Sequence, residues 1–158
     1  MALKTVRRSR PILGSWGPQL QPFRVVDVWA RPVRPEQTTD PTAWANAVFH
    51  PMNMPRVVQT LLRARDTMAR PFKLRTGSVS EPPATGFPQL DSSNNALLLG
   101  MDDRHLDFRV VLHVGQARVT VTTLVRINNW FGHCYWAVVR FFHPFITRSC
   151  LRRATPKT

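Results

Sequence analysis

The sequence predicts an α+β domain in which an antiparallel β-sheet wraps around a long C-terminal helix. Two observations support this prediction. Residues 97–125 alternate between apolar and polar side chains and contain two short turn signals, a pattern typical of three hairpin-linked strands. Residues 128–154 place apolar side chains at helical spacing over more than half of the helix circumference. Because such a helix is too apolar for an exposed position, we expect it to lie against the apolar face of the sheet and a second element.

The chain is expected to form one folded domain between two tails. Residues 1–18 are basic and are expected to form a flexible tail, residues 19–153 form the domain, and residues 154–158 form a disordered tail. Within the domain, the β-branched and aromatic residues of segment 23–30 predict a first strand. Pro32 ends that strand, because proline cannot donate a hydrogen bond to a neighbouring strand.

A smaller helical segment is predicted near residues 41–70. Asp40 or Thr39 is suited to cap its start, and Pro41 suits the first helical position. The second half of this range carries a firmer amphipathic pattern. The residues that follow, 75–94, are rich in Gly, Pro and Ser and therefore predict a loop.

Two turns set the predicted register of the three-stranded meander. Gly115-Gln116 suits a two-residue hairpin turn, and Asp102-Asp103 suits a second turn. Both turns independently place the apolar side chains on the same face, so a slip by one residue in either would destroy the agreement. The expected opposite pairs are Leu112 and Val119, Val110 and Val121, Phe108 and Thr123, Leu106 and Val125, Leu99 and Leu106, and Leu97 and Phe108.

The C-terminal helix is predicted to turn one apolar face toward this sheet. Asn128 or Asn129 can cap its start. Pro144 lacks the amide hydrogen that would reach the carbonyl of Arg140, so a kink is expected there. The face at helical spacing consists of Phe131, Tyr135, Val138, Phe142, Phe145 and Ser149.

Charge and cysteine content limit the classes of protein. The net charge is +13, and Asp107 is the last acidic residue of the chain. Such basic ends attract phosphates, nucleic acid or anionic membranes nonspecifically, but a basic surface without a dedicated partner is the simpler explanation. No apolar run approaches the roughly 18 to 20 residues that span a bilayer, so no transmembrane helix is predicted. Cys134 and Cys150 fall in one predicted helix and are expected not to form a disulfide, which favours a cytoplasmic location.

The polar face of the meander is the first candidate for chemistry. His105, Asp107 and Arg109 lie on one face of a predicted strand, and the register brings Arg126 beside them. Two interpretations remain open. The residues form a cross-strand ion network on the outer face of the sheet, or His105, Arg109 and Arg126 hold an anionic ligand. The sequence contains no nucleophile elbow, phosphate-binding glycine loop, dinucleotide fingerprint or metal-ligand cluster, so no catalytic residue, metal or cofactor is predicted.

The space between the helix and the sheet is the second candidate. It is either a filled core or a ligand cavity, and the sequence does not decide between them. Thr123 and Tyr135 are the expected polar anchors in an otherwise apolar wall. The predicted ligand-binding residues are Phe108, Val110, Val121, Thr123, Tyr135, Val138 and Phe142.

One stretch carries a resemblance to a known family. The run "LLLGMDDRHLDFRVVLHV", followed by "VTVTTLVRINN" and an aromatic helix with a His-Pro pair, resembles an uncharacterised bacterial domain family. The likeness covers roughly residues 45–153 and is most specific at "GMDDRHLDFRV". Domains of that family also occur fused behind NAD(P)-binding, short-chain-dehydrogenase-like domains, which implies a dehydrogenase-like partner. By a further analogy, the resemblance implies a helix-grip fold like that of lipid-transfer proteins.

Together these observations predict a non-catalytic domain that binds a hydrophobic or amphipathic small molecule between the sheet and the C-terminal helix. The alternative is a basic accessory module. It would bind an anionic surface, either a membrane or nucleic acid, or a dehydrogenase-like partner protein.

Overall fold

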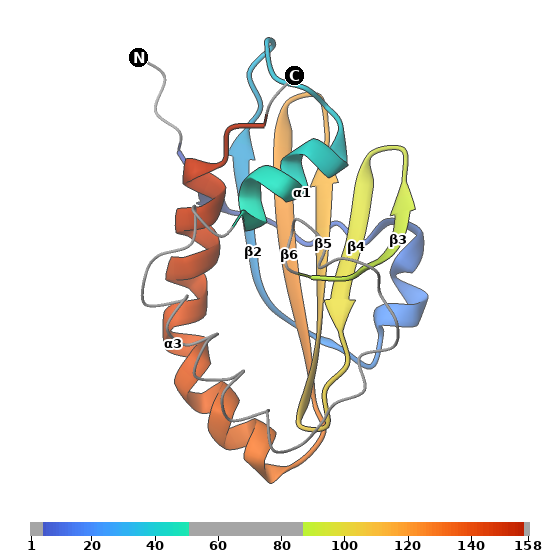
Figure 1. Cartoon of the computed structure of the whole chain (residues 1–158), viewed down its shortest axis with the longest axis vertical. Coiled ribbons are helices and arrows are strands. Elements are labelled where there is room, and N and C mark those ends of the chain that lie inside the picture. Colours follow the sequence, from blue (N-terminus) through green and yellow to red (C-terminus); the bar gives the residue numbers. More distant parts are fainter. Residues whose placement is uncertain (1–4, 51–86, 157–158) are drawn as a thin grey trace.

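A six-stranded antiparallel sheet and a long C-terminal helix form the fold, as Figure 1 shows. The computed structural model describes residues 5–50 and 87–156. The strands follow the order β1-β2-β6-β5-β4-β3. They are β1 (Arg7–Arg8), β2 (Arg24–Pro32), β3 (Gln89–Ser93), β4 (Ala96–Met101), β5 (Leu106–Val114) and β6 (Arg118–Ile127). Helix α1 (Pro41–Phe49) crosses one face of the sheet, and helix α3 (Trp130–Arg153) runs along its β2 side. The predicted α+β class, with a sheet against a long C-terminal helix, is confirmed.

Both faces of the sheet are covered by apolar side chains. The first core lies between the sheet, α1 and the C-terminal end of α3, and its fully buried members include Trp44, Val48, Leu97, Leu112, Val121 and Leu151. The second core lies on the other face, where two short 3-10 helices, Gly14–Trp16 and Pro18–Leu20, cover the strands. It consists of Trp16, Leu20, Ala96, Leu98, Val111 and Leu124. The face opposite the helices is therefore a second interior and not a solvated back.

The N-terminal segment is the first difference from the sequence prediction. Within the range expected to be a flexible tail, Arg7 and Arg8 pair with β2, and Val6 and Trp16 are buried. The indole N–H of Trp16 also donates a hydrogen bond to Asp91 at 2.8 Å. The physical reason is the apolar row of β4–β6 on that face, which would otherwise be exposed to water. The described part of this segment, residues 5–18, is therefore part of the fold.

The C-terminal end is also tied to the domain. Arg31 of β2 is buried, and its guanidinium donates hydrogen bonds to the carbonyls of Leu151, at 2.9 Å, and Ala154, at 2.7 Å. These carbonyls belong to the end of α3, where the last turn lacks partners within the helix and carries partial negative charge. Ala154, expected to begin a disordered tail, is instead fully buried.

The predicted strand faces are correct, but the predicted register is wrong. Leu112 pairs with Val121 instead of Val119. The hairpin closes one position later than expected, because the N–H of Gly115 already donates to the carbonyl of Arg118 at 2.8 Å. Leu99 likewise pairs with Val110, because strands β4 and β5 are joined by a loop over residues 102–105. Both displacements are even, and an even displacement keeps every side chain on its face.

Helix α3 faces the sheet with a different side from the predicted one. Gly132, His143 and Thr147 lie on the sheet side. The predicted inner face is exposed at Phe131, Tyr135, Val138, Phe142 and Phe145, although Ser149 is buried. The side of α3 that faces the sheet is the side that makes polar contacts with β2 and with the loop before β5, described below. It is not the most apolar side of the helix.

The predicted helix caps are confirmed where the structure describes them. Asp40 accepts hydrogen bonds from the N–H groups of Thr42 and Ala43 at the start of α1. Asn129 accepts one from Gly132 at the start of α3. Helix α3 continues through Pro144 as one element, and the helix predicted over the second half of residues 41–70 lies outside the described residues. In the described ranges, neither helix is both long enough and apolar enough to cross a bilayer.

The two cysteines of α3 differ in environment, which leads to a first prediction. Neither forms a disulfide; Cys134 is exposed, whereas Cys150 is buried. Burial raises the pKa of Cys150 to about 11, although the nearby Arg153 acts in the opposite direction. Because the thiolate is the reactive form, we expect only Cys134 to react quickly with Ellman's reagent at about pH 8 in the native protein. Equal native reactivity of C134S and C150S variants would contradict this, and both thiols should react after unfolding.

Candidate functional site

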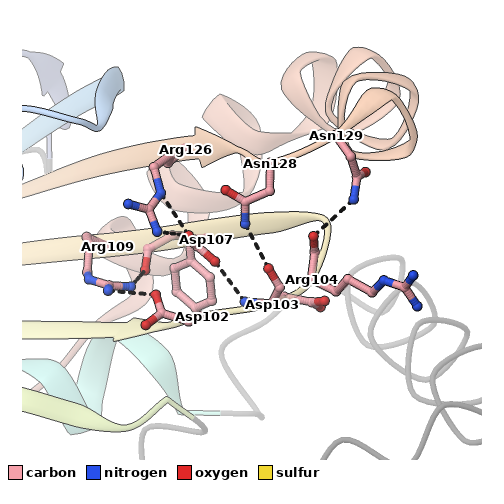
Figure 2. Close-up of polar contacts among 9 residues, drawn as sticks. Asp102, Asp103, Arg104, Asp107, Arg109, Arg126, Asn128 and Asn129 are labelled. Carbon is pink, nitrogen blue, oxygen red and sulfur yellow. Dashed lines mark hydrogen bonds and ion pairs between the residues drawn. The ribbon is translucent and has the colours of Figure 1, made fainter.

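A buried carboxylate organises the loop between β4 and β5, as Figure 2 shows. Asp107 is only 2% exposed. Its Oδ2 accepts a hydrogen bond from Nε of Arg126 at 2.9 Å, and its Oδ1 accepts one from the N–H of Asp103 at 2.9 Å. Burial alone would raise the pKa of Asp107, but the hydrogen bonds from Arg126 and Asp103 outweigh burial and lower it. Asp107 is therefore an ionised anchor in the folded protein.

The two arginines predicted to bind an anion are occupied by groups of the chain itself. Arg109 forms an ion pair with Asp102 at 2.6 Å and donates to the carbonyl of Phe108 at 2.9 Å. The guanidinium groups of Arg109 and Arg126 also lie over the ring of Phe23, at 4.8 and 5.2 Å from its centroid. These cation–π contacts fasten the segment before β2 to the sheet.

His105, the third predicted anion-binding residue, lies in the loop and not on β5. Its Nδ1 is 2.9 Å from the side-chain nitrogen of Asn129, and its ring is 4.7 Å from that of Phe131. Asn128 and Asn129 donate to the carbonyls of Asp103 and Arg104. The residues of "GMDDRHLDFRV" thus join the loop to the start of α3, and the anion-binding trio does not converge on a common space.

The predicted ligand-binding residues do not share a wall either. Val110 and Val121 are buried in the first core, and Phe108 packs beside it against Phe87, with ring centroids 5.1 Å apart. Thr123 is buried opposite Asp27 of β2. The helix residues Tyr135, Val138 and Phe142 lie on the exposed side of α3.

A groove nevertheless runs between the sheet and α3, in the region that the sequence predicted as a candidate, but none of the predicted ligand-binding residues lines it. It has a volume of about 570 Å³ and is open to solvent. The start of β2, the end of β6 and the first half of α3 form its walls. Its lining residues are Pro22, Arg24, Val26, Val125, Arg126, Ile127, His133, Trp136, Ala137 and Arg140.

The groove combines apolar walls with basic side chains. Val26, Ile127 and Trp136 contribute apolar surface, whereas Arg24 and Arg140 bring positive charge from β2 and α3. Arg126 also lines the groove, but its guanidinium is held by Asp107. Within the described residues, Arg24 and Arg140 form no ion pair, although the guanidinium of Arg140 lies 5.0 Å from the ring centroid of Phe141, so these two cations are the ones placed to receive an anionic group.

A hydrogen bond between a histidine and an aspartate beside the groove fixes the middle of α3 to the sheet. Nδ1 of His143 lies 2.6 Å from Oδ2 of the buried Asp27. The register of β2 is irregular between Val25 and Asp27, and such a bulge changes where a strand side chain points. Trp136 links this pair to the groove, because it lines the groove and its ring lies 5.8 Å from that of His143. The sequence does not predict this pair, since 116 positions separate its members. An isolated acid in an apolar strand is the local signal that it leaves.

Comparison with known proteins identifies a family but no characterised relative. A search of curated proteins and a search of solved structures each found no significant match. One family model, described as "Protein of unknown function (DUF2867)", matches residues 19–150, which include the loop around Asp107, the groove and most of α3. Because this match spans most of the sequence, the chain belongs to the DUF2867 family.

Proposed function

We propose that this domain is a non-catalytic binder of an amphipathic small molecule with an anionic head group, held in the groove between β2, β6 and α3. The groove itself is the observation that carries the proposal. Its volume of about 570 Å³ falls within the range of about 300 to 1,000 Å³ that is usual for small-molecule sites.

The chemistry of the lining supports an amphipathic ligand. Val26, Ile127, Trp136 and Ala137 offer apolar contact to a hydrocarbon or ring system. Arg24 and Arg140 offer guanidinium groups, which form paired hydrogen bonds with carboxylate or phosphate oxygens. The groove lining in the described part of the chain includes one histidine, His133, and no carboxylate, hydroxyl or thiol, which favours binding over nucleophilic chemistry.

The cysteines support a proposal about location. Cys134 and Cys150 are not disulfide-bonded, which fits a reducing compartment. We therefore place the protein in the cytoplasm as part of the same proposal.

Fluorescence titration with dansyl-labelled undecanoic acid tests the groove. We expect saturable binding of one molecule per chain, with weaker binding of its uncharged methyl ester. The double variant R24A/R140A should lose about tenfold in affinity, because a charge-assisted hydrogen bond contributes about 1.5 to 3 kcal/mol before solvent screening of these exposed groups. The matched control R118A removes an exposed arginine at the far end of β6 and should bind like the wild type.

A steric variant separates the groove from general surface attraction. Ala137 lines the groove and is exposed, so Ala137→Trp should fill the space and abolish binding while circular dichroism stays unchanged. Undiminished binding by A137W, or equal affinity for the acid and the ester, would overturn the proposal.

A further inference from the structure

The side of α3 that points away from the sheet is strongly apolar. Trp130, Phe141 and Phe145 are 75%, 71% and 66% exposed, and Val138 lies in the same row. Phe131, Tyr135 and Phe142 extend this row to one side and are also exposed. We call these seven residues the aromatic face. From Trp130 to Phe145 it extends over about 22 Å at the 1.5 Å rise of an α-helix.

The aromatic face belongs to a helix that carries only positive charge. Between Trp130 and Arg153 the sequence contains four arginines and no acidic residue. The guanidinium of Arg140 lies beside the face, 5.0 Å from the ring centroid of Phe141. The whole chain has a net charge of +13. A partner that covers this face must therefore be both apolar and negatively charged.

We propose that α3 lies flat on an anionic lipid bilayer, with the aromatic face inserted at the level of the headgroups. Helices that bind membranes in this way combine Trp and Phe on one side with arginines on another. Insertion parallel to the surface also agrees with the absence, among the described residues, of a helix able to cross the membrane. A second copy of this chain is a poorer partner, because two molecules of charge +13 repel each other.

Nucleic acid is the competing anionic partner, and the shape of the helix argues against it. Proteins that stack bases on aromatic rings place those rings in a basic groove that follows the phosphate backbone. Here the aromatic face lies on the outward side of a single helix, whereas the described lining of the basic groove on the inner side contains one Trp, Tyr or Phe ring, that of Trp136. A planar surface fits such a one-sided row better than a strand of nucleotides.

Vesicle co-sedimentation of the full chain tests this proposal. We expect binding to equimolar phosphatidylcholine and phosphatidylglycerol vesicles, and little binding to pure phosphatidylcholine. High salt should weaken the interaction, because it screens the attraction between arginines and lipid phosphates. The double variant F141S/F145S should bind at least about tenfold more weakly, since burial of two phenylalanines in the membrane is lost.

A matched double variant controls for loss of apolar surface in general. Val25 pairs with Leu124 of the second core and is therefore exposed on the face of the sheet opposite α3, and Leu90 is exposed on the edge strand β3. V25S/L90S should therefore retain vesicle binding. Full vesicle binding by F141S/F145S would overturn the proposal. The proposal would also be overturned if the protein did not bind vesicles but bound single-stranded DNA, and if F141S/F145S kept that DNA binding. The dansyl acid titration of the single variant F145S, which leaves the contact between Arg140 and Phe141 intact, should be unchanged, so failure here is distinguishable from failure of the groove proposal.

Discussion

Replacing Asp107 by alanine is expected to lower the free energy of unfolding by about 3 kcal/mol, because it removes one member of a buried, hydrogen-bonded charge pair. The N–H of Asp103 would lose its acceptor, and Arg126 would lose the partner that positions it over Phe23. Arg126 is partly exposed and can be hydrated again, which keeps the loss at the lower end of the range for buried pairs. Urea denaturation monitored by tryptophan fluorescence measures the effect.

The conservative variant Asp107→Asn separates charge from shape. Its side-chain oxygen can still accept from Asp103, so we expect a smaller loss, of about 1 to 2 kcal/mol. The lowered pKa of Asp107 means that its contribution is fully present above the pKa of the unfolded chain and is lost as the pH falls through the folded value. The stability difference between wild type and D107N should thus be constant near neutrality and shrink below about pH 4. A difference that is independent of pH down to acid unfolding would show that Asp107 is not an ionised anchor.

Replacing Gly132 by alanine is expected to destabilise the protein by about 3 kcal/mol, the upper part of the usual range for overpacking. A methyl group at this position would overlap the carbonyl oxygen of His105 and approach Cγ2 of Ile127 to 3.0 Å. The sign of this stability change is informative, because glycine-to-alanine substitution within a helix normally stabilises a protein by about 0.5 to 1 kcal/mol. The same urea titration measures this effect. Since the start of α3 would be displaced, binding of the dansyl acid should weaken too.

Gly115 provides the matched control. An added methyl group there would make only ordinary contacts, with the carbonyl oxygen of Arg118 at 3.5 Å and with Cε1 of His113 at 3.7 Å. Gly115→Ala should therefore change the free energy of unfolding by no more than about 0.5 kcal/mol. If G132A were as stable as G115A, the close approach of the loop to α3 would be refuted.

The sequence predicts the faces of the strands well because side chains alternate strictly along a strand. Phe108 and Val121 lie on one side in both the expected and the observed register, since the displacements are even. The register itself depends on which residues close each hairpin. Gly115 suggested a turn beginning at its own position, whereas it is already paired with Arg118. Local turn signals are compatible with both placements, so the sequence does not choose between them.

The orientation of α3 and the groove were not predictable in the same way. Apolar periodicity places Phe131 and Phe142 inside, but the pairing of Asp27 with His143 turns the helix so that they are exposed. That pairing joins positions far apart in the sequence, and hydrophobic patterns contain no information about it. Arg24 and Arg140 read as ordinary surface arginines, because only the folded chain brings β2 and α3 together around one space.

Helix α3 is held at its start by Asn129, in its middle by His143 and at its end by the carbonyls that receive Arg31. Because these contacts are distributed along its whole length, we expect α3 not to move away from the sheet as a rigid body. A ligand of the kind proposed above would enter the open groove from the side, past Arg24 and Arg140, without displacement of the helix. Exchange of the ligand should accordingly proceed without the microsecond-to-millisecond opening of a chain segment that enclosed cavities require. The residence time of the ligand should then depend on its affinity alone.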